Sequence, residues 1–177
     1  MSRRDAAKIA AIIALFLLII PLLQSFFFRY TTDGNIRVDK EVKADFLPKS
    51  EKKIILLFFG YYGCGDICTP FLENLSLIYD SKEFLPYQKT VDFYFVNLNP
   101  RVKKHEPQDF ANYFHKNFKG IYLSQEEIMH IDRNFGLYHA VSLQDKNEIT
   151  HTDNLYLLER VGEKVVLREY YLNKIFE

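Results

Sequence analysis

The feature that most constrains this chain is an apolar run that leads into a pair of cysteines. Residues 54–59 read Ile-Ile-Leu-Leu-Phe-Phe. A short run of this kind, β-branched at its start, is typical of a strand buried on both faces within a sheet that helices cover. The chain's only two cysteines, Cys64 and Cys68, follow with three residues between them. Thr69 suits the N-cap of a helix and Pro70 its first position, so the pattern predicts a strand that delivers two thiols to a helix start.

The remaining sequence alternates between strand and helix patterns. Helices are expected over 70–79, after Pro107, over 124–134 from the capping box Ser124-x-x-Glu127, and over 171–176; strands are expected over 91–98, 120–123 and 138–141, and as a hairpin over 155–159 and 164–169. Alternation of this kind implies a βαβ core that an antiparallel hairpin completes. The predicted fold class is α/β with a thioredoxin-like fold, in which active thiols follow the first core strand.

Composition excludes some classes of function. The chain has 177 residues, with 23 basic and 23 acidic side chains. A nucleic-acid-binding protein needs a clustered basic surface, which this balance does not indicate. Without the N-terminal segment, about 130 residues remain, enough for one domain with its own core and no disulfide framework. The two cysteines therefore indicate a site rather than a scaffold.

The N-terminal segment predicts a membrane anchor. Residues 9–28 are almost entirely apolar and just long enough to span a bilayer as a helix. Basic residues within 1–8 precede this span, so the positive-inside rule keeps the N-terminus in the cytoplasm. A cleaved signal peptide is the alternative, but bulky aromatics stand where small residues would mark a cleavage site. We expect a single-pass protein of a bacterial inner membrane, with a tether over 29–50 and a periplasmic domain over 51–177.

The cysteine pair has the chemistry of a metal or redox site. A helix N-terminus favours the thiolate, and two sulfurs on one side of a turn suit copper or, less specifically, zinc. A structural disulfide across three residues would restrict the unfolded chain very little. A third ligand is expected, and in a thioredoxin-like layout the segment that holds His151 faces the thiols. The other histidines are His105, His115, His130 and His139, for which solvated or packing roles are expected.

Four segments resemble the Sco/SenC family of membrane-anchored, copper-binding thioredoxin-like proteins. The segment 57–68 is similar to the family's apolar strand, glycine, aromatic residue and Cys-Pro-Asp-x-Cys-Pro motif. The other three are residues 95–101, residues 118–128 and residues 149–158, of which the last contains His151 before a Tyr-Leu strand. The segments occur in the family's order and span about residues 50–170.

The resemblance implies that Cys64, Cys68 and His151 bind one copper ion. It also implies that the protein delivers copper to the copper A centre in subunit II of cytochrome c oxidase, or matures that centre. A periplasmic thiol–disulfide oxidoreductase that keeps partner cysteines reduced through Cys64 and Cys68 is the alternative, and a redox or copper sensor is a third possibility. Asn99 and Thr150 stand where the family usually has acids that would orient ligands, and Gly65 replaces the usual proline.

Overall fold

The computed structural model describes residue 17, residues 19–20, residues 35–141 and residues 149–172. Residues 36–177 form one compact unit, separate from the unit formed by residues 1–35. Nearly all of the predicted membrane span lies outside the described residues. Within the described ranges, no helix is both long and apolar enough to cross a bilayer.

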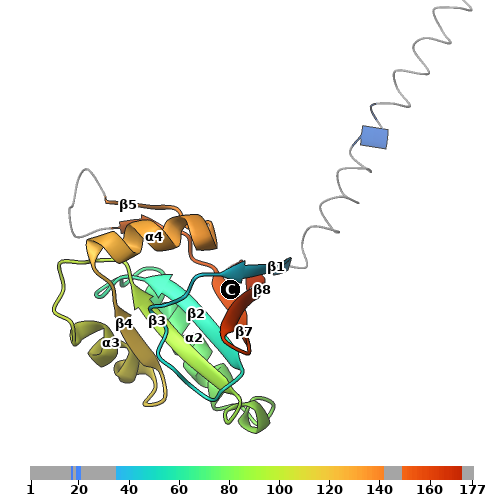
Figure 1. The fold of residues 1–177 in the computed structure, drawn as a ribbon, viewed down its shortest axis with the longest axis horizontal. Helices are drawn as coiled ribbons and strands as arrows, with labels where there is room; N and C mark the ends of the chain where they lie inside the picture. Colours follow the sequence, from blue (N-terminus) through green and yellow to red (C-terminus); the bar gives the residue numbers. More distant parts are fainter. Residues whose placement is uncertain (1–16, 18, 21–34, 142–148, 173–177) are drawn as a thin grey trace, which may run out of the picture. The chain divides into compact units, whose positions relative to one another are not determined.

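A six-stranded mixed sheet forms the centre of the compact unit (Figure 1). Its strands, in spatial order, are β1 (Asn35–Val42), β8 (Lys164–Tyr171), β7 (Leu155–Val161), β2 (Ile54–Gly60), β3 (Val91–Asn97) and β4 (Lys119–Tyr122). β2 pairs in parallel with β3 and antiparallel with β7. The apolar run of β2 therefore lies in the middle of the sheet, where both faces of a strand are covered.

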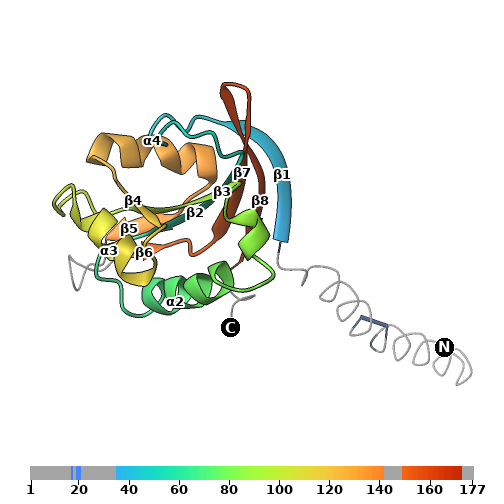
Figure 2. The same cartoon turned by 90° about the horizontal axis from the view of Figure 1, so that it is seen from below.

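Helices cover both faces of this sheet (Figure 2). α2 (Cys68–Tyr79) and α3 (Glu106–Phe114) lie on one side, and α4 (Gln125–Phe135) lies on the other. Alternate residues of β2 accordingly belong to two core clusters, with Phe58 facing α2 and Phe59 facing α4. Both clusters lie within residues 42–167, so the compact unit contains the core that it needs to fold on its own. The predicted thioredoxin-like arrangement of sheet and helices is confirmed.

Local signals fixed several elements correctly. Ser124 and Glu127 form the reciprocal hydrogen bonds of a capping box at the start of α4. Gly136 ends α4 in the left-handed conformation, at φ 63°, which glycine adopts without strain. The hairpin of β7 and β8 turns at Gly162, as the sequence predicted.

Other predictions were wrong at the helix ends. α2 begins at Cys68 with Ile67 as its N-cap residue, and no side chain caps it. Thr69 instead donates a hydrogen bond from Oγ1 to the Cys64 carbonyl, over 2.9 Å, because it lies inside the first turn. At the other end of the chain, the expected helix does not start at Tyr171, which belongs to β8; residues 173–177 lie outside the described ranges.

The sheet also takes in more of the chain than expected. Residues 29–50 were predicted to form a tether, whereas β1 has eight residues and lies beside β8 in the main sheet. Val42, Ala44 and Leu47 are buried in the core, so residues 36–50 pack as part of the compact unit. A second sheet is formed by β5 (His139–Val141) and β6 (Ile149–His151), which pair antiparallel. Residues 142–148 lie outside the described residues.

Candidate metal centre

The two thiols lie between β2 and α2, with Cys64 in the connecting loop and Cys68 at the start of the helix. Cys64 and Cys68 are both buried and both free, and neither is bonded to another sulfur. The Cys68 N–H points at Cys64 Sγ, 3.5 Å away. Because α2 has no side-chain N-cap, this sulfur occupies the place of a capping acceptor at a helix N-terminus. The position favours a negatively charged Cys64.

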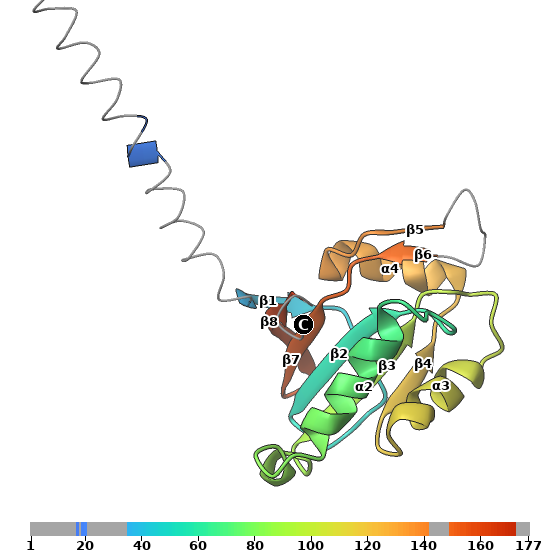
Figure 3. The same cartoon turned by 180° about the vertical axis from the view of Figure 1, so that it is seen from behind.

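His151 approaches the thiols from the second sheet. It is the last residue of β6, and its Nε2 atom lies 3.7 Å from Cys68 Sγ. Figure 3 shows β5 and β6 beyond the end of the sheet at which β2 stops and α2 begins. The other ring nitrogen, Nδ1, lies 2.9 Å from the Thr152 carbonyl oxygen, which can only accept a hydrogen bond. Nδ1 therefore carries the proton, and in the neutral ring Nε2 presents its lone pair towards the sulfurs.

The three ligand atoms form a compact group. One atom from each of Cys64, Cys68 and His151 lies within 4.8 Å of the other two, and no other set of three such ligands is found among the described residues. Metal bonds of about 2.0–2.3 Å to nitrogen and sulfur place ligand atoms about 3.5–4 Å apart. Two thiolates and an imidazole are soft to intermediate donors of the kind that copper prefers. The donor set and its spacing thus fit copper with only a small contraction.

The two cysteines differ sharply in acidity. A hydrogen bond from the Cys68 thiol lowers the pKa of Cys64 to about 3, although burial opposes the shift, and the backbone N–H groups of Cys68 and Ile67 lower it further. The pKa of Cys68 is raised, first because the Cys68 thiol donates its proton in a hydrogen bond to Cys64, and also because the Cys68 side chain is buried. One thiolate is consequently ready to bind, whereas the second sulfur must release a proton before it can do so.

Gly60 leaves the space that Cys68 occupies. A Cβ atom at this position would lie 2.7 Å from Cys68 Sγ and 2.9 Å from the Phe95 ring. Side chains from β2 and the loop after it also shape the pocket around the imidazole, since Phe58 and Tyr61 both contact His151 edge to face. The glycine that ends β2 is therefore a packing requirement of the thiol site.

Asn97 braces the loop that carries the thiols, and sequence analysis missed it. This fully buried side chain ends β3. Its Oδ1 atom accepts a hydrogen bond from the Tyr62 N–H over 2.9 Å, and its Nδ2 atom donates to the Asn99 carbonyl over 2.6 Å. A polar residue at the end of an otherwise apolar strand was the available signal. Asn97 ties the loop after β2 to the loop after β3.

The positions expected to carry acids do not supply ligands. The Asn99 side chain accepts a hydrogen bond from the Arg101 N–H, and the Thr150 side chain is exposed. Orientation of His151 comes instead from the Thr152 carbonyl.

The other histidines lie apart from the thiols, as expected. His105 and His130 are exposed, and His115 and His139 lie near Asp80 and Asp132 respectively. His115 is the C-cap residue of α3. His139 lies opposite His151 in the β5–β6 register, but its Nδ1 atom is 2.9 Å from Asp132 Oδ1.

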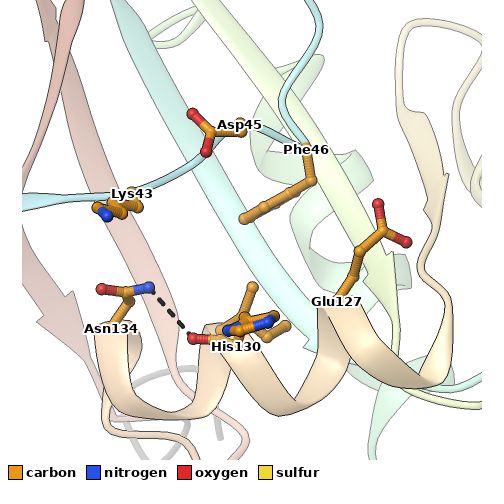
Figure 4. Close-up of a pocket in the computed structure, with 7 residues that line it drawn as sticks. Lys43, Asp45, Phe46, Glu127, His130 and Asn134 are labelled. Carbon is orange, nitrogen blue, oxygen red and sulfur yellow. Dashed lines mark hydrogen bonds between the residues drawn. The ribbon is translucent and has the colours of Figure 1, made fainter.

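A separate hollow of about 320 Å³ lies between α4 and the chain after β1 (Figure 4). Asp45, Glu127 and His130 are among its lining residues. Among the described residues these three do not form a group close enough to hold a metal, and Asn134 donates a hydrogen bond to the His130 carbonyl. The hollow is distinct from the thiol site and carries no comparable chemistry.

A mixed sheet covered by helices on both faces, with two thiols at the start of the helix after its central strand, defines the thioredoxin-like class. Comparison with known proteins narrows the class. The SCO1/SenC family profile matches residues 44–174. The chain belongs to the SCO1/SenC family.

Curated relatives agree with this assignment. Protein SCO2 homolog, mitochondrial, of mouse is 28% identical over 135 residues, which cover 73% of this chain and 49% of the relative. Protein SCO1 homolog, mitochondrial, of human is 24% identical over 147 residues, covering 81% and 46%. The chain therefore spans about half the length of these relatives.

Solved structures show the same fold. Apo Sco1 of Thermus thermophilus superposes with a TM-score of 0.57 at 24% identity, covering 80% of this chain and 84% of that one. ScoI of Arabidopsis thaliana, solved with copper bound, has a TM-score of 0.56 at 21% identity, covering 78% and 89%.

Proposed function

We propose that this chain is a copper-binding assembly factor that takes one copper ion between Cys64, Cys68 and His151. The observation that carries the proposal is the approach of the three ligand atoms to within 4.8 Å of one another. It is supported by relatives from Arabidopsis thaliana, Bradyrhizobium japonicum and yeast whose structures were solved with copper bound. A further solved relative, BsSco, is described as a member of the Sco family of cytochrome c oxidase assembly proteins.

The proposed recipient is the copper A centre in subunit II of cytochrome c oxidase. The Cys64 thiolate, which hydrogen bonds stabilise, provides the first sulfur, Cys68 becomes the second after losing its proton, and His151 adds the nitrogen. The proton that leaves Cys68 links binding to pH, because only the thiolate binds metal. Transfer then requires the recipient's own ligands to replace these three. Copper is the cargo in this scheme.

Copper titration of the reduced compact unit tests the proposal. One equivalent should bind, and Cu(II) should produce thiolate-to-metal charge-transfer bands. Cys64→Ser and Cys68→Ser should each abolish these bands, because either change removes a sulfur ligand. Binding that persists at full strength in both variants would contradict the site. A pull-down of the copper-loaded protein with the soluble domain of subunit II, followed by copper analysis of the recipient, tests delivery.

A second candidate function uses the same sulfurs for thiol–disulfide exchange, since the structure holds both as free thiols of different acidity. In this reaction the Cys64 thiolate attacks a partner disulfide, a mixed disulfide forms and one partner thiolate leaves. Cys68 then attacks Cys64, which releases the second partner thiol and leaves a Cys64–Cys68 disulfide. Cys68→Ser should trap the mixed disulfide, visible on a non-reducing gel. No trapped partner in a periplasmic extract would count against this function.

The proposed location is the bacterial inner membrane, with residues 9–28 as the anchor and the compact unit over 36–177 in the periplasm. The composition of the span and the basic residues before it support this topology. Alkaline phosphatase fused after Glu177 should be active, because the enzyme needs the oxidising periplasm to form its disulfides. If the phosphatase fusion is inactive and a fusion to green fluorescent protein at the same position fluoresces, the C-terminal domain is cytoplasmic and the proposed topology is wrong.

A further inference from the structure

The end of the domain farthest from the thiols exposes apolar side chains. α2 starts at Cys68 and, with twelve residues, ends about 18 Å away. There it meets the short 3₁₀ helix η1 (Leu85–Tyr87). Leu77 is 71% exposed, Leu85 51% and Tyr87 59%, and Ile78 is also exposed. We call these four residues the apolar tip.

The apolar tip is held in a fixed shape. The Tyr79 and Phe84 rings pack at 5.2 Å, and the Leu85 N–H donates a hydrogen bond to the Ser81 carbonyl. The Gln88 side chain donates to the Tyr79 carbonyl over 2.7 Å. Because the backbone of both helices is tied together, the exposed leucines and tyrosine are presented by a rigid support. A group of exposed apolar side chains of this kind is typical of an interaction surface.

A basic hollow adjoins this tip. It has a volume of about 630 Å³, and Tyr79 and Gln88, which tie the tip together, also line it. Its lining contains one acid, Asp92, and four lysines, which are Lys52, Lys89, Lys116 and Lys119. We call it the lysine hollow. The buried Asp92 carboxylate engages Lys119 at 2.8 Å and Lys52 at 3.5 Å.

The other two lysines are uncommitted. Lys89 and Lys116 are exposed, and within the described part of the chain neither makes a hydrogen bond or ion pair. The acids Asp80 and Glu83 are not among the residues that line the hollow, and Asp80 lies 3.2 Å from His115 instead. The hollow thus concentrates positive charge in a chain whose net charge is zero.

We propose that the apolar tip and the lysine hollow bind an anionic lipid surface. Exposed leucine and tyrosine side chains enter the interface between headgroups and acyl chains, and adjacent lysines attract the headgroup phosphates. Neither feature alone distinguishes a lipid surface from an acidic protein, but a rigid apolar tip beside unpaired lysines matches both layers of a bilayer interface. A domain bound in this way has its thiols about one α2 length away from the lipid. The proposal does not depend on copper binding.

Fluorescence of a single tryptophan tests it. The chain has no tryptophan, so Leu85→Trp in the compact unit 36–177 introduces one reporter within the tip. With phosphatidylcholine vesicles that contain about one third phosphatidylglycerol, its emission should shift to the blue and be quenched by brominated lipid. Pure phosphatidylcholine and high salt should both prevent the shift. Met129→Trp is the control, because Met129 is 57% exposed on α4, on the other side of the sheet.

Charge variants complete the test. Lys89→Gln with Lys116→Gln should weaken vesicle partitioning about 30-fold, since each lysine near an anionic surface contributes about 1 kcal/mol. Lys103→Gln with Lys104→Gln removes the same charge from an exposed loop after β3 and should change partitioning little. Equal weakening by both pairs would overturn the proposal, as would equal binding to neutral vesicles. Unshifted tryptophan emission at position 85 in the presence of anionic vesicles would also overturn it. The apolar tip would then be a candidate surface for an acidic protein partner.

Discussion

Nε2 of His151 lies 3.7 Å from Sγ of Cys68, although 83 residues separate them in the chain. Cys68 is the first residue of α2, which packs on the main sheet, and His151 is the last residue of β6 in the second sheet. The contact turns a pair of thiols into a three-ligand group. The properties of this group lead to several measurable consequences.

His151→Ala should lower copper affinity at least tenfold while leaving the fold intact. In the proposed site the imidazole supplies one of three ligands, and it is only partly buried, so its loss should remove a metal bond without opening the core. Competition with a copper chelator measures the affinity, and thermal unfolding checks the fold. His130→Ala, a change of the same kind on the exposed face of α4, serves as the control. Equal affinity of the two variants would remove His151 from the site.

Gly60→Ala should destabilise the domain by about 1–3 kcal/mol, the usual cost of inserting an atom into a packed core. The new Cβ would meet Cys68 Sγ and Phe95, both of which are buried. Urea unfolding measures the loss, and a weaker copper complex should accompany it. Gly65→Ala is the matched control, because a Cβ there meets nothing within 4 Å. A Gly60→Ala protein as stable as the Gly65→Ala protein would show that the contact with Cys68 relaxes freely.

Asn97→Ala should cost about 1–3 kcal/mol and also weaken copper binding. The change removes the acceptor for the Tyr62 N–H and the donor to the Asn99 carbonyl, both of which a fully buried side chain supplies. Without this brace, the loop that carries Cys64 should hold its sulfur less firmly. Asn112→Ala removes an exposed asparagine from α3 and controls for the substitution. If copper affinity stays at the wild-type value while stability falls, Asn97 supports the fold alone.

Asp92→Asn should reduce both stability and its dependence on pH. Burial raises the pKa of Asp92, but the hydrogen bond and charge of Lys119, with Ser50 and Lys52, outweigh burial, and the net pKa is lowered. A lowered pKa stabilises the folded state above the unfolded value near 4, and this contribution is lost as pH falls through the folded pKa. At neutral pH the variant should lose about 1–3 kcal/mol.

Urea unfolding at neutral pH and at about pH 3 measures the effect of Asp92. The difference in stability between wild type and Asp92→Asn should shrink at the acidic end. Asp45→Asn, in an exposed position, should follow the wild-type pH profile. A constant difference across this range would mean that the pKa of Asp92 is the same in the folded and unfolded states, against the lowered pKa on which the prediction rests.

Elements with strong local signals were predictable from sequence. The unbroken apolar run predicted β2 because a central strand is covered on both faces, and the Ser124 and Glu127 pair predicted the start of α4 through its own hydrogen bonds. The position of both thiols followed from these neighbours. By contrast, Thr69 has the composition of an N-cap residue, yet α2 begins two residues earlier, with Ile67 as its N-cap, and the Thr69 hydroxyl donates to the Cys64 carbonyl.

Features that depend on distant parts of the chain were not predictable in the same way. β1 is mostly exposed and polar, and only its place beside β8 makes it part of the sheet. The three-residue strand that holds His151 carries too few residues for a period to be read. Asn97 has a polar side chain that becomes a brace only when two loops meet over it. The ligand group was anticipated through its resemblance to a family, and its packing and hydrogen bonds came from the fold.

Because β5 and β6 form only a short sheet, the two sides of the candidate centre differ in local stability. Cys64 and Cys68 belong to a cluster fixed by the main sheet, whereas His151 depends on a pair of three-residue strands. Amide hydrogen exchange should accordingly open the His151 strand at a lower free energy than β2 or β3. A bound copper ion would link His151 to the two cysteines. The amides of β6 should therefore gain the most hydrogen-exchange protection when copper binds. Release could then begin on the histidine side while both sulfurs still hold the ion.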